Sequence, residues 1–164
     1  MSRFNGKRVF ITGAGSGFGR RTAEKFAEEG VAAVYLVDIL QKRLDVVEKE
    51  INDRGATAIP MCFDLADADA CQQAMAQALS DAPIDILVCN AAAVAEEKFL
   101  DIRIESWKRQ IDVNLTAYFV LSRDAARSMV KQGAGVILFT ASIDAQGHSM
   151  EFTPIVYPKP GRFP

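Results

Sequence analysis

The chain has 164 residues, of which 49% are hydrophobic and 24% charged, and its formal net charge is -2. This length supports one core and one domain, and the charge balance provides no basic field for a nucleic-acid backbone. No apolar run reaches the roughly 18 to 20 residues of a membrane span, and residues 1–8 lack the hydrophobic stretch of a signal peptide, so we expect a cytoplasmic protein without nucleic-acid or membrane partners.

Short apolar runs alternate with longer amphipathic segments, which is typical of β-α units on a parallel sheet. Because nearly continuous apolar strands occur in sheets buried on both faces, we expect helices on both faces. The predicted fold class is α/β, a Rossmann-type doubly wound parallel sheet in three layers with about five strands. Strands are expected at 8–12, 33–38, 58–63, 84–90 and 135–140, and helices at 17–29, 40–54, 67–79 and 106–132.

Helical spacing also predicts which side chains face the core. In the first helix Ala23 and Ala27 share the apolar face, and Glu24 is expected to point away from it. In the last helix Tyr118 and Phe119 are both assigned to apolar positions.

The three cysteines have no CxxC spacing, and each lies in an otherwise apolar segment. We interpret Cys62, Cys71 and Cys89 as buried free thiols rather than metal ligands or a redox pair. No metal site is predicted.

A glycine-rich turn at Thr12–Gly19 follows the first predicted strand and opens the first predicted helix. This context is typical of a dinucleotide-binding loop, although a purely structural turn is the alternative. Without side chains at Gly13, Gly17 and Gly19, the backbone can turn sharply and approach a pyrophosphate, whose charge is favoured at a helix N-terminus. The residues expected to contact the cofactor here are Thr12, Gly13, Gly15, Ser16, Gly17, Phe18 and Gly19.

Asp38 ends the second predicted strand, about 20 residues beyond the turn, where a carboxylate can accept hydrogen bonds from the adenosine ribose. The carboxylate would repel a 2′-phosphate, and the next residue, Ile39, offers no cation to compensate. The sequence therefore favours NAD over NADP, while a simple turn-forming role for Asp38 is the alternative.

The chain resembles the classical short-chain dehydrogenase/reductase family at four landmarks between about Lys7 and Ser142. They are the Thr-Gly-x-x-x-Gly-x-Gly turn, Asp64-Leu65 after the third strand, Cys89-Asn90-Ala91-Ala92 after the fourth, and Asn114 in the long helix. The resemblance implies that Asp64 hydrogen-bonds the adenine amine and that Leu65 lies beside it. Asn90, Ala91 and Ala92 are similar to the family's Asn-Ala-Gly beside the cofactor, with Ala in place of Gly.

The same resemblance implies a catalytic set of Asn114, Ser142 and Tyr157, in which the tyrosine exchanges a proton, the serine hydrogen-bonds the substrate oxygen and Asn114 supports a relay water. From the residues alone, Ser142 could equally be a turn serine and Asn114 an ordinary helical residue. The family places a Tyr-x-x-x-Lys pair about thirteen residues after the serine, on one helix face. Tyr157 lies fifteen residues after Ser142, and Gly161 occupies the lysine position. We interpret Tyr157 as the remnant of the catalytic tyrosine.

Four prolines lie between Pro154 and Pro164, and no further strand or helix is predicted there. We expect an incomplete NAD(P)-binding domain at residues 1–157 and an irregular Pro-rich tail at 158–164. The family's remaining strands and helices form the substrate pocket and much of the subunit interface, so a homodimer or homotetramer is expected only with those helices.

The expected function is NAD-dependent hydride transfer between nicotinamide and a small alcohol or ketone. A non-catalytic NAD-binding form is the alternative, and an unstable product with an uncovered fifth strand is a third possibility.

Overall fold

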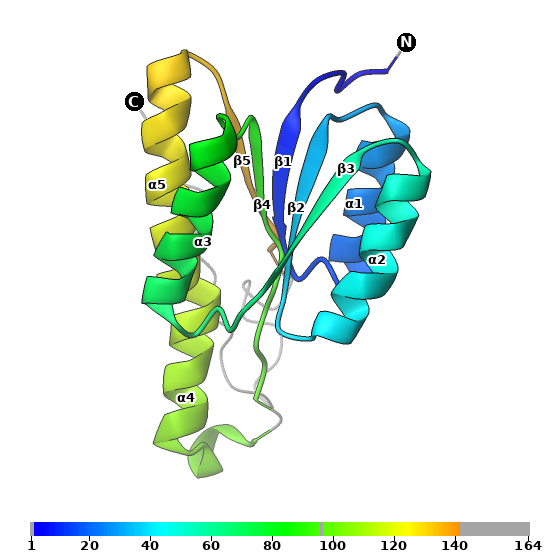
Figure 1. The fold of residues 1–164 in the computed structure, drawn as a ribbon. Coiled ribbons are helices and arrows are strands. Elements are labelled where there is room, and N and C mark those ends of the chain that lie inside the picture. Colours follow the sequence, from blue (N-terminus) through cyan, green and yellow to red (C-terminus); the bar gives the residue numbers. More distant parts are fainter. Residues whose placement is uncertain (1, 96, 142–164) are drawn as a thin grey trace.

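The computed structural model describes residues 2–95 and 97–141, which form a parallel sheet with helices on both sides (Figure 1). The five strands lie in the order β3-β2-β1-β4-β5, which confirms the predicted Rossmann-type fold. The strands are β1 (Arg8–Thr12), β2 (Ala33–Asp38), β3 (Thr57–Cys62), β4 (Ile86–Cys89) and β5 (Val136–Phe139). The helices are α1 (Gly17–Glu28), α2 (Gln41–Asp53), α3 (Ala68–Asp81), α4 (Ile104–Ile111) and α5 (Ala117–Gln132), with a 3-10 turn at Phe99–Asp101.

Side chains that alternate along the strands form two cores, one on each face of the sheet. Phe10 and Tyr35 pack with buried residues of α3 and α5, whereas Ile11 and Leu36 pack with buried residues of α1 and α2. Figure 1 shows the same division, with α1 and α2 on one side and α3 and α5 on the other.

The coverage of β5 differs from the expectation that both sheet faces are covered. Val136 and Leu138 are exposed, although Leu138 is in register with the buried Val88 of β4. Because alternate residues share a face, these two side chains lie on the α1 side of the sheet. Among the described residues, α1 and α2 cover β1 and β2 and leave this part of β5 uncovered.

The long predicted helix is divided in two. A π-helical stretch at Asp112–Thr116 separates α4 from α5, so that the helical region begins at Ile104 and changes geometry before Ala117. Tyr118 is buried as predicted, but Phe119 is 61% exposed, which contradicts its assignment to the core.

Two other predicted burial assignments are wrong. Glu24 is nearly buried on α1, where Arg20 and Arg21 pair with its carboxylate and offset the cost of removing the charge from water. Cys62 is exposed at the end of β3, while Cys71 and Cys89 are buried free thiols as predicted.

The sheet topology determines where a ligand can bind. β1 pairs with β2 on one side and with β4 on the other, and the chain crosses between these two halves after β3. In open parallel sheets, the point where strand order reverses leaves a crevice at the carboxyl ends of the strands. Here that crevice lies beyond Thr12 and Cys89, and α4 projects past the same edge of the sheet (Figure 1).

Candidate functional site

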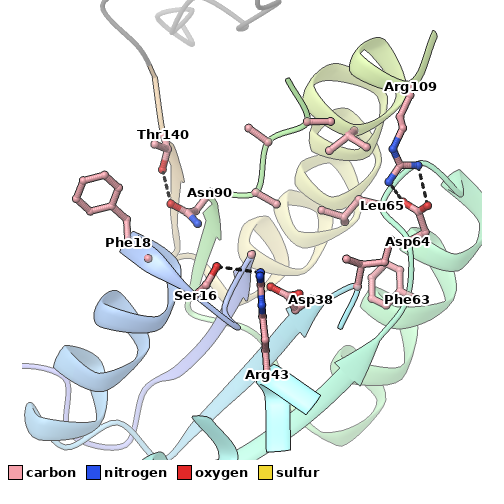
Figure 2. A pocket seen from close by; sticks show the side chains of 17 residues that line it. Ser16, Phe18, Asp38, Arg43, Phe63, Asp64, Leu65, Asn90, Arg109 and Thr140 are labelled. Atoms are coloured by element: carbon pink, nitrogen blue, oxygen red, sulfur yellow. Dashed lines mark hydrogen bonds and ion pairs between the residues drawn. The ribbon is translucent and has the colours of Figure 1, made fainter. Parts of the chain in front are cut away.

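A cleft of about 450 Å³ occupies this edge of the sheet (Figure 2). Its walls come from the turn before α1, the loops after β2, β3 and β4, the helices α2 and α4, and the end of β5. Among the described residues the lining consists of Gly13, Ser16, Gly17, Phe18, Asp38, Ile39, Arg43, Phe63, Asp64, Leu65, Asn90, Ala91, Ala92, Ala93, Arg109, Val113 and Thr140. The cleft thus brings together predicted residues from four separate segments.

Glycine is required at the positions of this turn for two different physical reasons. Gly13 and Gly17 have φ of +67° and +52°, a backbone conformation that side chains disfavour. Gly19 is required by packing instead, because a Cβ there would overlap the carbonyl oxygen of Gly13. The turn is therefore held tightly against the first turn of α1, whose residues Gly17 and Phe18 line the cleft and whose first N–H groups have no partner within the helix.

Thr12 and Gly15 support the turn from outside the cleft lining. The Thr12 hydroxyl is buried and accepts hydrogen bonds from the backbone N–H groups of Asn90 and Ala91, at 2.9 and 3.1 Å. The Gly15 N–H donates to Asp38 Oδ2 at 3.1 Å, and a Cβ on Gly15 would lie 2.8 Å from that oxygen. These contacts join the ends of β1, β2 and β4.

Asp38 is only 8% exposed and both of its oxygens are hydrogen-bonded. Oδ1 accepts from the Leu40 N–H at 3.1 Å, and Oδ2 accepts from Gly15. A carboxylate has about four acceptor positions, so each oxygen can still accept a hydrogen bond from a hydroxyl in the cleft. The neighbouring Ile39 is exposed and lines the same wall.

The loop after β3 carries the opposite wall. Arg109 of α4 donates to both oxygens of Asp64, from NH1 at 2.8 Å and from NH2 at 3.3 Å. The guanidinium, by this hydrogen bonding and by its charge, holds the pKa of the Asp64 carboxyl below its usual range. Leu65 is nearly buried beside it and supplies apolar surface.

The segment after β4 forms the floor of the cleft. The Asn90 side chain donates to the Thr12 carbonyl at 3.2 Å and accepts from the Thr140 hydroxyl at 3.3 Å. The Tyr118 hydroxyl donates to the Ala91 carbonyl at 2.6 Å. The loop containing Ala91 and Ala92 is therefore tied to β1, β5 and α5.

Asn114 lies in the π-helical stretch and is 1% exposed. Its amide donates to the Ala93 carbonyl and accepts from the Ala93 N–H, both at 2.8 Å. Both polar groups of the side chain are thus used to hold the loop after β4, and Asn114 does not line the cleft. Ser142 and Tyr157 lie outside the described residues.

The cleft fits a dinucleotide in shape and chemistry. It combines a glycine turn that tolerates no Cβ at Gly15 or Gly19, a helix N-terminus suited to phosphate, and an acceptor at Asp38 suited to ribose hydroxyls. The sequence profile of the short chain dehydrogenase family matches residues 7–157. The chain belongs to this family.

Known members of the family are similar in sequence and in structure. Human L-xylulose reductase is 36% identical over 138 residues, which cover 84% of this chain and 53% of the reductase. The structure of a 7α-hydroxysteroid dehydrogenase in complex with NADH and 7-oxo glycochenodeoxycholic acid has a TM-score of 0.86 at 32% identity, covering 93% of this chain and 60% of the other. The chain therefore spans little more than half the length of these relatives.

Family structures hold either form of the cofactor. A 3-oxoacyl (acyl-carrier-protein) reductase from Agrobacterium tumefaciens with NADP bound has a TM-score of 0.86 at 27% identity, covering 93% of this chain and 58% of the other. Solved structures similar to this chain thus hold either NADH or NADP.

Six residues of the cleft lining were not predicted from the sequence: Phe63, Ala93, Val113, Thr140 and the two cations, Arg43 and Arg109. Arg43, in the first turn of α2, donates to the Ser16 hydroxyl at 3.4 Å. It places in the cleft lining a positive charge that the sequence does not provide at position 39, directly after Asp38. Arg109 reaches Asp64 across 45 positions of sequence. Arg43 could have been predicted to line the cleft, because it closely follows the turn between β2 and α2. No local sequence spacing predicts that Arg109 lies there.

In residues 2–95 and 97–141, no three His, Cys, Asp or Glu side chains lie together in a way that could hold a metal ion. None of the helices in this part of the chain is long and apolar enough to cross a membrane.

Proposed function

We propose that this short-chain dehydrogenase binds NAD in the cleft and transfers hydride between the nicotinamide and the carbinol or carbonyl carbon of a small alcohol or ketone. The observation that carries the proposal is the convergence of the glycine turn, Asp38 and Asp64 on one cleft at the strand ends. The names of the relatives, which are reductases and dehydrogenases, favour this function over a non-catalytic NAD-binding form.

The residues of the chain have distinct tasks in this proposal. The N–H groups at the start of α1 bind the pyrophosphate, because they are unpaired within the helix and lie at its positive end. Asp38 accepts hydrogen bonds from the adenosine ribose, and Asp64 accepts one from the adenine amine. The bound nicotinamide supplies or takes up the hydride.

The proton steps follow from the family resemblance. Tyr157 would exchange the proton with the substrate oxygen, and Ser142 would hydrogen-bond that oxygen. Asn114 would support the water of the proton relay. It would do so by holding the loop after β4 in place through its hydrogen bonds with Ala93.

The preference for NAD over NADP is part of the proposal. Asp38 lines the cleft, and we expect it to accept hydrogen bonds from the ribose hydroxyls and its charge to oppose a 2′-phosphate. Arg43 and Ser16 belong to the same lining as Asp38 and offer a cation and a hydroxyl. We expect the carboxylate to dominate because it is nearly buried, whereas Arg43 is exposed and screened by water.

Calorimetric titration of the 164-residue chain with NADH and NADPH, followed by an assay on a panel of secondary alcohols and ketones, tests the proposal. We expect NADH to bind at least tenfold more tightly than NADPH, and Tyr157→Phe to keep NADH binding and lose turnover. Absence of NADH binding would contradict the proposed site, and full turnover by the variant would contradict the role of Tyr157.

We further propose that the protein acts in the cytoplasm, where three free thiols would stay reduced. Assembly into a homodimer or homotetramer is proposed for a chain that carries the family's remaining helices. Cell fractionation and size-exclusion chromatography test these two points.

A further inference from the structure

The ion pair between Arg109 and Asp64 differs from the other ion pairs of the described residues. Its two members come from the last turn of α4 and from the loop after β3, and both line the cleft (Figure 2). No other ion pair in residues 2–95 and 97–141 has both partners in that wall. Both side chains are partly exposed, and exposed pairs contribute little to folding stability, so stability alone does not account for this contact.

The hydrogen bonds of the pair determine what Asp64 can still accept. Asp64 Oδ1 accepts from the Ala66 N–H at 2.9 Å and from Arg109 NH2, whereas Oδ2 accepts from Arg109 NH1. With about two acceptor positions on each oxygen, a position on Oδ2 remains for a ligand. The planar fork of the guanidinium fixes the plane of the carboxylate, and thereby the direction of that remaining position.

Charge adds a chemical requirement to this geometry. Next to the guanidinium, the pKa of the Asp64 carboxyl stays below its usual range, so the group is ionised at neutral pH and can only accept hydrogen bonds. A ligand N–H at this position is favoured, and a ligand carbonyl oxygen is repelled.

We infer that Arg109 is a positioning residue that fixes the Asp64 carboxylate so that the cleft distinguishes a 6-amino purine from a 6-oxo purine. The inference rests on the proposed function, in which Asp64 faces the adenine of NAD. Arg109 acts through Asp64, since the purine hydrogen-bonds the carboxylate and not the guanidinium.

Reduced nicotinamide hypoxanthine dinucleotide provides the test, because it differs from NADH by an oxo group in place of the adenine amine. We expect the unmodified chain to bind NADH about tenfold more tightly than this analogue in calorimetric titrations, since a hydrogen bond to a charged group is lost with the amine. In Arg109→Met the ratio should fall to about twofold. In Arg109→Lys it should be intermediate, because one ammonium cannot hold both oxygens in a fork.

Arg103→Met is the matched control. Arg103 is the N-cap residue of α4 and pairs with Glu97 at 2.7 Å, but neither residue lines the cleft. Its ratio of affinities should equal that of the unmodified chain.

The outcomes separate this inference from the proposed function. An unmodified chain that binds no NADH contradicts the proposed function itself. NADH binding with a ratio that stays near tenfold in Arg109→Met, or an equal loss of affinity for both nucleotides, contradicts the positioning role alone. Equal affinity of the unmodified chain for both nucleotides also overturns it. If Arg109→Met does not fold, the ratio measured for Arg109→Lys decides.

Discussion

The carboxylate of Asp38 shows how one side chain serves both the fold and the ligand. Its two oxygens accept hydrogen bonds from the backbone N–H groups of Gly15 in the glycine turn and Leu40 before α2. A role for Asp38 toward ribose could be predicted from its place at the end of the second strand. Its role in holding the glycine turn could not, because hydrogen bonds between distant segments leave no pattern in the sequence.

Neutralising this carboxylate should change cofactor preference. In Asp38→Asn we expect NADPH to bind about tenfold more tightly and NADH several-fold more weakly, because repulsion of the 2′-phosphate is removed while Arg43 and Ser16 remain in place. Calorimetric titration with both nucleotides measures the effect.

Asp45→Asn serves as the control, since Asp45 is an exposed carboxylate of the same α2 region that does not line the cleft. An unchanged NADPH affinity in Asp38→Asn would show that the charge of Asp38 does not determine the preference.

Position at a strand end also indicated where other residues lie in the fold, but it did not indicate their burial. Asp64 and Asn90 could be placed at the edge of the sheet because each lies within two residues of the end of an apolar strand, and strand ends in a parallel sheet share one edge. Cys62 also ends a strand, but on β3 at the edge of the described sheet, so an apolar neighbourhood in sequence did not imply burial.

At the scale of elements, the first half of the chain matches its predicted pattern closely. β1 and β2 have the predicted bounds, because the apolar pattern of a strand and the turn residues that end it are both local properties of the sequence. The π-helical stretch at Asp112–Thr116 could not be predicted, since apolar residues continue through it. Tyr118 is buried and Phe119 is not, because consecutive residues of a helix point about 100° apart and only one of the two can face the core.

The junction between β1 and α1 should be intolerant of a single methyl group. Gly19→Ala is expected to destabilise the chain by about 2 kcal/mol or more and to weaken NADH binding, because the new Cβ would overlap the Gly13 carbonyl. Urea unfolding and calorimetric titration measure the two effects.

Gly55→Ala is the comparison, because Gly55 has φ of +87° but open space around its Cβ position. It should cost only about 1 kcal/mol of backbone strain and leave NADH affinity unchanged. Similar behaviour of the two variants would argue against the packing role of Gly19.

At the scale of the whole molecule, the reactivity of two buried thiols measures how readily the core between the sheet and the α3–α5 layer opens. Cys71 and Cys89 both belong to that core, and burial raises their pKa values to about 11 and about 12. At pH 8 we expect one thiol per chain, Cys62, to react rapidly with a disulfide reagent, while the other two react at the rate of unfolding.

The pH dependence of this core follows from the direction of the shifts. A thiol whose folded pKa is raised favours folding while the pH is below its unfolded value of about 8.5, and this contribution is lost as the pH rises further. Stability should therefore decline in alkaline solution. Cys62→Ser should abolish the rapid phase, and a second rapid thiol in that variant would indicate that the core opens without unfolding.

The paired contacts between Asn114 and Ala93 have a consequence for motion. The side-chain amide of Asn114 and the backbone of Ala93 exchange two hydrogen bonds, each group donating one and accepting one, as paired residues do in a β-sheet. The π-helical stretch and the floor of the cleft are thus mechanically linked, and a displacement of one must carry the other. We therefore expect the width of the cleft and the position of α5 to change together.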